Sequence, residues 1–309
     1  MSTSRSIDVP PGVRWITLPT DRGSFAAFEA LPATGVCERR PALLVPGFTG
    51  SKEDFLPILR QLGAAGRRVV AIDLRGQYET AGTDDRESYR LGPLGADVAS
   101  VVAAIASDPD STSARGEPGV HLLGHSFGGL VARQAVLSEA PGICSLTLMS
   151  SGPGKLTGQA ASVLRAVLQP LEGRRGPELA AAVKRLWDIQ LAIGAKLEGT
   201  PPDIVEFLGR RMLRSHPDSL VVAGEELLAS PDRTGELAAA AAVAKLPLLV
   251  LYGEYDDKWV TPVQEHMAER LRAERVCIPG GAHSPAVEAP ETTASALNAF
   301  WNRAEKISR

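Results

Sequence analysis

Short apolar runs alternate along this chain with stretches in which apolar residues recur at helical spacing. The runs are apolar at nearly every position, which is typical of strands buried on both faces of a sheet. The stretches between them present one apolar face, as helices that cover a sheet do. This alternation predicts an α/β fold with a doubly wound, mostly parallel sheet. The runs are Ala42–Val45, Val69–Asp73, Val120–Leu123, Leu146–Met149, Leu248–Tyr252 and Arg275–Ile278, and the helical stripes include Phe55, Ile58, Leu59 and Leu62, then Val98, Val101, Val102 and Ile105.

The interval 152–245 breaks this alternation, because it contains no convincing strand and reads as helices separated by Gly and Pro. We therefore expect residues 1–151 and 246–309 to form the core and residues 152–245 to form an inserted helical cap. Most of the apolar stripes of the interval suit helix packing, and some of them should line a cleft beneath it. The stripes are Leu179, Val183, Leu186 and Trp187, then Val205, Leu208, Met212 and Leu213, with Glu225–Leu228 and Leu237–Val243 closing the unit.

The N-terminal part of the chain predicts a hairpin and no export signal. Val13–Leu18 and Phe25–Ala30 flank the turn Thr20–Gly23 and suggest two antiparallel strands. The segment Met1–Pro11 lacks the apolar stretch of a signal peptide, and no run approaches the roughly 20 apolar residues of a membrane span. We expect a cytoplasmic protein without a membrane span.

Composition limits the partners of the chain. It has 309 residues, of which 44% are hydrophobic and 22% charged, and a formal net charge of −3. No basic stripe interleaved with aromatic residues is present, so a nucleic-acid partner is not expected. Three cysteines, Cys37, Cys144 and Cys277, lie far apart without CxxC spacing, which favours a reducing compartment. Cys144 and Cys277 stand in apolar runs, where we expect them to be small buried hydrophobes. The sequence does not indicate an oligomeric state.

The segment Val120–Gly129 passes from an apolar run into a serine between glycines and then into a helical stretch. A serine on a strand-to-helix turn needs small neighbours such as Gly124 and Gly128, and its hydroxyl then projects above the N-terminus of the helix. The positive end of that helix can stabilise an alkoxide or an oxyanion. Ser126 is therefore the candidate nucleophile. The alternative is a Gly-rich turn of the kind found in any α/β protein.

A serine nucleophile needs a histidine base, and the chain has 5 histidines to choose from. His283 follows the run Arg275–Ile278 and a flexible Pro-Gly-Gly-Ala segment, which places it at the C-terminal edge of a strand, where open α/β sheets build their sites. It is the candidate base. The others are less suitable, since they stand in a strand (His121), in the serine turn (His125), in the cap (His216) and on a polar helix (His266).

The carboxylate that orients the base should follow the preceding strand. There Leu248–Tyr252 runs into Gly-Glu-Tyr and the tandem acids Asp256 and Asp257. We take Asp256 as the candidate that fixes the tautomer of His283 and stabilises its imidazolium. Asp257 stays open as the alternative, and tandem acids after a strand can also be solvated turn residues.

Two backbone amides should bind the oxyanion of an acyl-transfer reaction. The turn at the nucleophile supplies the amide of Phe127. The second should come from the loop after Ala42–Val45, where Pro46 and Gly47 precede Phe48 and glycines let the backbone present the Phe48 amide. Taken alone, Pro-Gly is only a turn signal.

With these residues the chain resembles the α/β-hydrolase family, in the order nucleophile, acid and histidine with a helical cap between the first two. The resemblance covers nearly all of the chain after the hairpin. It implies an α/β-hydrolase core, covalent acyl-enzyme chemistry on esters, thioesters or amides, and no metal or organic cofactor. The motifs that carry it are Gly124-His125-Ser126-Phe127-Gly128-Gly129, Gly253-Glu254-Tyr255-Asp256 and Ala282-His283-Ser284-Pro285, followed by Glu288 and Pro290.

Two positions depart from the pattern of the family. Pro46 stands where many members have a histidine before the oxyanion glycine. The loop Asp73–Thr80 resembles the Asp-x-Arg-Gly-x-Gly-x-Ser motif, but Tyr78 and Thr80 replace its second glycine and its serine. The loop beside the oxyanion hole is therefore expected to differ from that of its relatives.

The sequence thus predicts a serine hydrolase that acts on a small-molecule ester or related acyl substrate through Ser126, His283 and Asp256. The same residues would serve an acyltransferase, a thioesterase or a cofactor-free perhydrolase. A protein of this fold that binds a small ligand without turning it over is the alternative from another class.

Overall fold

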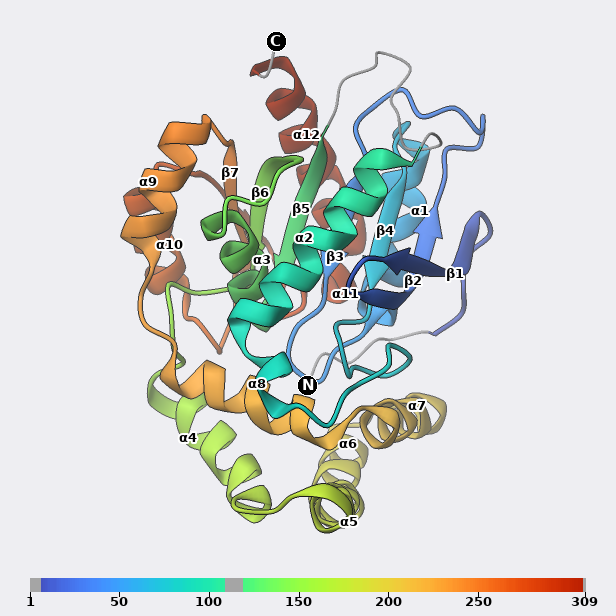
Figure 1. The fold of residues 1–309 in the computed structure, drawn as a ribbon, viewed down its shortest axis with the longest axis vertical. Coiled ribbons are helices and arrows are strands. Elements are labelled where there is room, and N and C mark those ends of the chain that lie inside the picture. The colour runs from blue at the N-terminus through green and yellow to red at the C-terminus, as the bar shows by residue number, and fades with distance from the viewer. Residues whose placement is uncertain (1–6, 109–118, 308–309) are drawn as a thin grey trace.

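The computed structural model describes residues 7–108 and 119–307 of the chain. Residues 1–6, part of the segment Met1–Pro11 in which no signal peptide is expected, lie outside the described part, and so do 109–118 of the expected core. An eight-stranded sheet runs through the molecule in the order β1-β2-β4-β3-β5-β6-β7-β8 (Figure 1). The strands are β1 Val13–Thr20, β2 Gly23–Ala30, β3 Ala42–Val45, β4 Val69–Ile72, β5 Val120–His125, β6 Ile143–Met149, β7 Leu248–Gly253 and β8 Glu274–Ile278.

The sheet confirms the expected fold class. From β4 to β8 every neighbouring pair is parallel, while β1 and β2 form the predicted hairpin and join the sheet antiparallel through β4. Strands β3, β4, β5 and β7 are buried at every residue, as continuous apolar runs require.

Strand β8 is different, because it forms the edge of the sheet. Its first residues are exposed, and the expectation that Cys277 is buried was wrong. An edge strand has a neighbour on one side only, so an apolar residue there can face the solvent.

Cys144 lies in β6, inside the sheet, and is half-buried. Burial raises the pKa of its thiol to about 11.

Helices cover both faces of the sheet, as the alternation of the sequence predicts. Because side chains alternate along a strand, Leu43 faces the layer of α2, α3 and α10, whereas Leu44 faces the layer of α1, α11 and α12. Figure 1 shows α2 in front of the sheet and α12 behind it. The helices of the core are α1 Leu56–Ala64, α2 Leu91–Ser107, α3 Phe127–Leu137, α10 Thr261–Leu271, α11 Pro285–Glu288 and α12 Pro290–Ile307.

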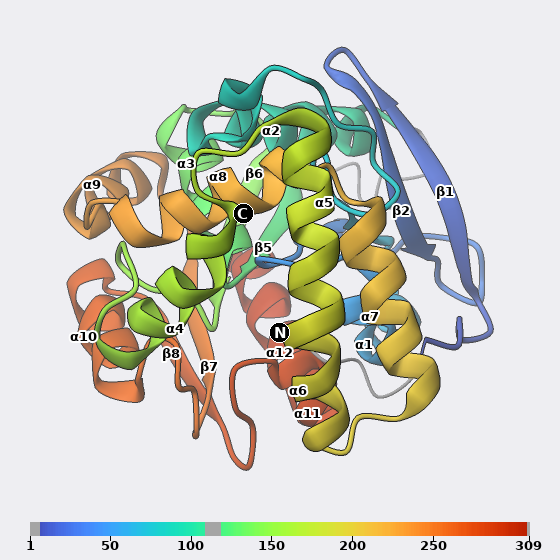
Figure 2. The same ribbon diagram turned by 90° about the horizontal axis from the view of Figure 1, so that it is seen from below.

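Between β6 and β7 the chain forms helices joined by turns, without a strand in residues 152–245, all of which are described. Helices α4 to α8 lie below the sheet in Figure 1 and cross in front of its strands when the molecule is seen from below (Figure 2). Helix α9 packs beside α3 and α10 instead. The bounds are α4 Gly158–Leu168, α5 Gly176–Leu186, α6 Ala192–Leu197, α7 Pro202–Arg214, α8 Pro217–Ala229 and α9 Thr234–Ala244, with a π-helical turn at Trp187–Leu191.

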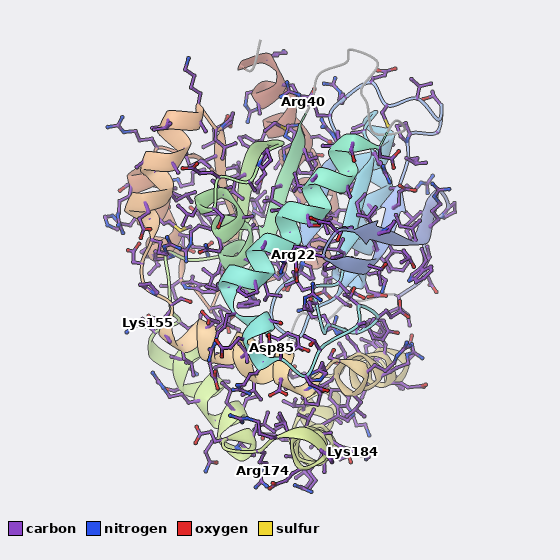
Figure 3. The ribbon with its side chains drawn as sticks, viewed as in Figure 1. Arg22, Arg40, Asp85, Lys155, Arg174 and Lys184 are labelled. Atoms are coloured by element: carbon purple, nitrogen blue, oxygen red, sulfur yellow. The ribbon has the colours of Figure 1, made fainter. Side chains whose placement is uncertain are left out.

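The apolar stripes of the inserted helices mainly serve packing. Leu179, Val183 and Trp187 are buried, and Trp187 packs so closely on α7 that a Cβ at Gly209 would lie 2.7 Å from its Nε1. Leu213 is exposed, unlike the other members of its stripe. The outer side of the insertion carries charged side chains such as Arg174 and Lys184 (Figure 3).

Buried polar contacts hold the inserted helices on the core. Arg211 of α7 donates to Asp54 Oδ1 at 2.7 Å, and both side chains are almost completely buried. Next to α8, the amide of His216 donates to the carbonyl of Gly76 at 2.8 Å. Each member of such a buried pair needs the other, because a buried charge without a partner is strongly destabilising. The insertion therefore has fixed points on the loops that follow β3 and β4.

A second buried polar network anchors the C-terminal helix. His121 of β5 contacts Ser145 Oγ through Nδ1 at 2.7 Å and Glu305 Oε1 of α12 through Nε2 at 3.1 Å. Burial lowers the pKa of His121 to about 4, so the ring is neutral near pH 7. A neutral ring that donates from Nε2 to Glu305 and accepts from Ser145 satisfies both contacts. Burial would raise the pKa of Glu305, but the bonds from His121 and Arg67 outweigh it and lower that pKa to about 2.

His121 should make the stability of the fold depend on pH. Its pKa is lower in the folded chain than in the unfolded one, so unfolding takes up a proton between roughly pH 6.5 and 4. The free energy of unfolding therefore decreases as the pH is lowered through this window. We expect the contribution of His121 to fall by about 2 kcal/mol from pH 7 to pH 5. Urea denaturation of the wild type and of His121→Gln at both pH values measures it.

The substitution His266→Gln is the control, because this exposed histidine on α10 lies outside the network. His125 is also buried with a lowered pKa, so it too makes the free energy of unfolding decrease as the pH falls. The test therefore compares the loss of stability from pH 7 to pH 5 in the wild type with that in each variant. An equal loss of stability from pH 7 to pH 5 in the wild type and in His121→Gln would contradict the assignment.

Candidate active site

Ser126 stands on the sharp turn between β5 and α3. Its backbone has φ 55° and ψ −120°, a conformation that a residue with a side chain adopts only at a cost of order 1–3 kcal/mol. The turn is crowded: a Cβ at Gly124 would lie 2.2 Å from the carbonyl oxygen of Gly128, and one at Gly128 would lie 2.4 Å from that of Pro46. The glycines are therefore required, and they bring α3 and the loop after β3 against the serine.

Ser126, His283 and Asp256 form a chain of hydrogen bonds. His283 Nε2 lies 3.0 Å from Ser126 Oγ, and its Nδ1 lies 2.9 Å from Asp256 Oδ1. The three residues follow β5, β8 and β7, whose C-terminal ends meet at one edge of the parallel sheet. With Nδ1–H donating to the carboxylate, Nε2 can accept the serine proton.

Of the tandem acids, the structure brings Asp256 to the histidine. The Asp256 side chain is 0% exposed, whereas that of Asp257 is 67% exposed and bonds Lys258 Nζ at 2.8 Å. The chain turns back immediately after the strand, and adjacent side chains point to different sides.

Further residues, which sequence reasoning missed, hold this chain in place. Asp256 accepts from the amide of Lys258 at 2.9 Å and, through Oδ2, from Gln264 Nε2 at 2.9 Å. Gln264 lies in the first turn of α10 and also donates to the carbonyl of Trp259 at 2.6 Å. A glutamine in an ordinary helical sequence carries no signal for this role.

His125 supports the loop of His283. Its Nε2 lies 2.8 Å from the carbonyl oxygen of His283, and burial lowers the pKa of His125 to about 4. The neutral ring donates this bond and thereby fixes the backbone that carries His283. The other histidines lie elsewhere: His121 in its buried network, His216 before α8, stacked on Tyr89, and His266 exposed on α10.

The amides of Phe48 and Phe127 lie close to the serine. Phe127 is the first residue of α3 and directly follows Ser126, while Gly47 lies so close that a Cβ there would be 3.0 Å from Ser126 Cβ. Among the hydrogen bonds of the described residues, neither amide donates to a protein acceptor. Both amides thus lack a protein acceptor among the described residues, as donors to an oxyanion must.

The loop after β4 is bound to the loop after β3 through a buried charge cluster. Asp73 accepts from the amide of Lys52 at 2.7 Å and from its Nζ at 3.0 Å. Lys52 also contacts Glu53 and Glu79, and it is completely buried. Burial raises the pKa of Asp73, while the charge of Lys52 and its two hydrogen bonds lower it. Three carboxylates around one ammonium therefore hold the two loops together.

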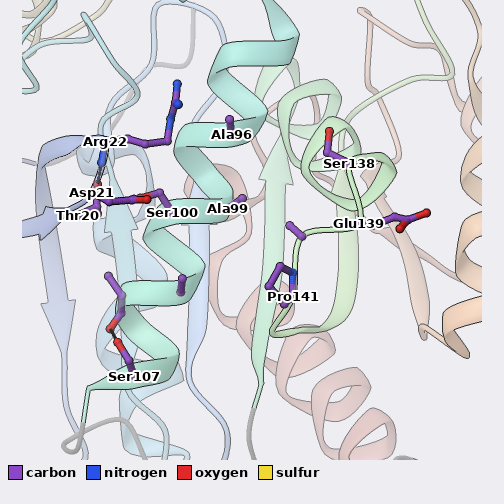
Figure 4. A pocket seen from close by; sticks show the side chains of 13 residues that line it. Thr20, Asp21, Arg22, Ala96, Ala99, Ser100, Ser107, Ser138, Glu139 and Pro141 are labelled. Atoms are coloured by element: carbon purple, nitrogen blue, oxygen red, sulfur yellow. Dashed lines mark hydrogen bonds between the residues drawn. The ribbon is translucent and has the colours of Figure 1, made fainter.

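A surface pocket lies away from this site. It is formed by the β1–β2 turn, α2 and the segment after α3, and residues such as Arg22, Ser100 and Glu139 line it (Figure 4). None of the predicted site residues belongs to it. In the residues that the structure describes, no three His, Cys, Asp or Glu side chains gather as metal ligands, and no helix is long and apolar enough to cross a membrane.

Comparison with known proteins identifies the family of the chain. Residues 42–296 match the model of the alpha/beta hydrolase family. The pimeloyl-[acyl-carrier protein] methyl ester esterase of Edwardsiella ictaluri is 30% identical over 85% of this chain and 93% of its own length. A protein of Variovorax paradoxus named as a carbamate hydrolase, RutD, is 32% identical over 38% of this chain, and the match spans only 40% of that protein.

A thermophilic esterase from Thermogutta terrifontis has a similar structure, with a TM-score of 0.68 at 20% identity over 94% of this chain and 99% of that one. At this identity the likeness shows the fold alone. The family model matches most of this chain. The match to the Edwardsiella esterase spans nearly the whole length of that protein. The chain therefore belongs to the alpha/beta hydrolase family and is a hydrolase.

Proposed function

We propose that the protein is a serine hydrolase that cleaves a carboxylic ester or a related acyl substrate through an acyl-enzyme. The observation that carries the proposal is the hydrogen-bonded chain Ser126–His283–Asp256 beside two free amides. A nucleophile within reach of a base, and a base oriented by a buried carboxylate, are the parts that acyl transfer requires. The name of the Edwardsiella relative, a methyl ester esterase, supports an ester as the substrate.

In the first half of the reaction, Ser126 Oγ attacks the carbonyl carbon while His283 Nε2 takes its proton. The carbonyl oxygen becomes an oxyanion, which accepts hydrogen bonds from the amides of Phe48 and Phe127. His283 then donates the proton to the departing alcohol, and the bond between the carbonyl carbon and the leaving oxygen breaks. Asp256 keeps Nδ1–H in place and stabilises the imidazolium throughout.

In the second half, water replaces the alcohol. His283 takes a proton from the water as its oxygen attacks the acyl carbon, and the same two amides stabilise the second oxyanion. The proton then returns to Ser126 Oγ as the ester bond to the serine breaks. The carboxylic acid leaves, and the enzyme is restored without any other reactant.

We also propose that residues 152–245 act as a cap over the site. Helices α4 to α8 lie below the sheet (Figure 1) and bond the loops that follow β3 and β4. Ser126, which follows β5, is only 6% exposed. A substrate must therefore enter between the insertion and the loops of the core. The small-molecule acyl substrate would be selected by the side chains of these helices that face the serine.

Removing the nucleophile should abolish turnover. We expect Ser126→Ala to lower kcat on a short p-nitrophenyl ester by about 10⁴-fold or more, because loss of a triad member leaves only binding and the oxyanion donors. The measurement is release of p-nitrophenol, together with labelling by a fluorophosphonate probe. Ser138→Ala is the matched control, because this serine follows α3 on the side remote from the site. Undiminished turnover in Ser126→Ala would refute the proposed mechanism.

The tandem acids should differ sharply. Asp256→Asn removes the carboxylate that stabilises the imidazolium, so we expect kcat to fall by about 10²- to 10⁴-fold. Asp257→Asn changes an exposed residue that contacts only Lys258 among the bonds described, and kcat should stay within about twofold. Steady-state kinetics of both variants on the same ester decide the matter. A larger loss at position 257 would reverse the assignment.

A further inference from the structure

The loop after β4 carries Gln77, whose side chain reaches the loop that holds the Phe48 amide. We propose that Gln77 is a positioning residue for the oxyanion site: it fixes the peptide between Gly47 and Phe48 so that the Phe48 amide keeps its direction. The inference rests on the proposed function. Two bonds of one buried side chain carry it.

The Gln77 amide has partners on both of its atoms. Its Nε2 donates to the carbonyl oxygen of Gly47 at 3.0 Å, and its Oε1 accepts from the amide of Leu74 at 3.0 Å. Both partners are backbone groups, and Gln77 is 8% exposed. A carbonyl can only accept and an amide N–H can only donate, so a single orientation of the glutamine amide satisfies both.

The Gly47 carbonyl and the Phe48 N–H belong to one peptide group. In a trans peptide these two bonds point in opposite directions, so a donor that fixes the carbonyl also fixes the direction of the N–H. A hydrogen bond to the carbonyl also polarises the peptide and makes its N–H a stronger donor. Gln77 thus acts on the oxyanion donor from the far side of the peptide, without contact with the substrate.

This peptide needs outside support because its turn is strained. The amide of Gly50 donates to the same carbonyl of Gly47 at 3.1 Å, which closes a tight turn over residues 47–50. Within that turn Thr49 has a φ of 58°, a left-handed conformation that is unfavourable for a β-branched residue. A strained turn keeps its shape only where its surroundings determine it, and the Gln77 bond is part of those surroundings.

The backbone segment that carries Gln77 is itself held by hydrogen bonds. Asp73 bonds the amide of Lys52 and its ammonium group, and the amide of Gln77 donates to the carbonyl of Leu74 at 2.8 Å. Tyr78, the next residue, is bonded to Ser215 through its amide at 2.9 Å. The glutamine therefore extends from a fixed segment across to the Gly47 carbonyl.

The test compares two substitutions of nearly equal size. Gln77→Met keeps the length of the side chain but loses both bonds. Gln77→Glu keeps an acceptor for the amide of Leu74 and, when ionised, loses the donor to Gly47. Thr80→Val is the control: Thr80 is buried in the same loop and bonds Asp73 and Ala26, but it has no contact with residues 46–50 among the bonds described.

For each variant we would measure kcat and KM on a p-nitrophenyl ester and the Ki of a trifluoromethyl ketone. This inhibitor adds to the serine, and its oxyanion occupies the site of the reaction oxyanion. Complete loss of such a donor costs about 10²- to 10³-fold. We expect a misdirected donor to lower kcat by about tenfold or more and to raise Ki by a similar factor, with KM within about threefold.

A purely structural role for Gln77 would give a different result. It would lower the urea midpoint, as Thr80→Val should, without a matched change in kcat and Ki. Wild-type kcat and Ki in both glutamine variants, or losses no larger than in Thr80→Val, would overturn the proposal. Where Gln77→Met does not fold, Gln77→Glu decides by the same criteria.

The wild type and Ser126→Ala, measured beside these variants, separate this inference from the proposed function. If the wild type turns over the ester and Ser126→Ala does not, while the Gln77 variants stay fully active, only the role of Gln77 is refuted. If the wild type shows no turnover with any ester or thioester of a graded panel, or if Ser126→Ala is as active as the wild type, the proposed function and the inference are refuted together.

Discussion

The backbone conformation of Ser126 is the constraint on which the site depends. A φ of 55° at a residue with a side chain is held only by its surroundings, here by the close contacts of Gly124 and Gly128 and by the bond from the amide of Ser126 to the carbonyl of Met149. Any larger residue at either glycine would push apart the strand, the helix and the loop after β3. The serine therefore has one position, and the loops that carry Asp256 and His283 are arranged around it.

Much of this arrangement follows from the sequence, because burial on both faces leaves a strong pattern. Strand β3 has the predicted bounds, and the other parallel strands differ from prediction by only a few residues at their ends. The error at Cys277 has a physical cause: an apolar run does not reveal whether its strand is central or at an edge. The choice between Asp256 and Asp257 also needs coordinates, since both follow the same strand and only the path of the turn separates them.

Other residues could not be predicted because they act through the backbone of distant segments. Gln264 contacts Asp256 from the next helix, His125 holds the carbonyl of His283, and Gln77 holds that of Gly47. Each bond joins two loops, and nothing in the local sequence of one loop specifies its neighbour. The sequence did indicate that the loop Asp73–Thr80 differs from the pattern of the family, and this loop carries Gln77.

The replacement of a glycine by Tyr78 in this loop links the core to the insertion. Tyr78 has a φ of 39°, which costs free energy for a residue with a side chain. Its ring offsets that cost through contacts that a glycine cannot make. The ring lies edge-on to that of Phe207 in α7, with 5.8 Å between the ring centroids, and Lys52 Nζ lies 4.8 Å from the centroid of the Tyr78 ring. Because Tyr78 follows Gln77 directly, the packing of the insertion fixes the segment from which Gln77 reaches the Gly47 carbonyl. The helices between β6 and β7 and the peptide between Gly47 and Phe48 are therefore parts of one connected structure.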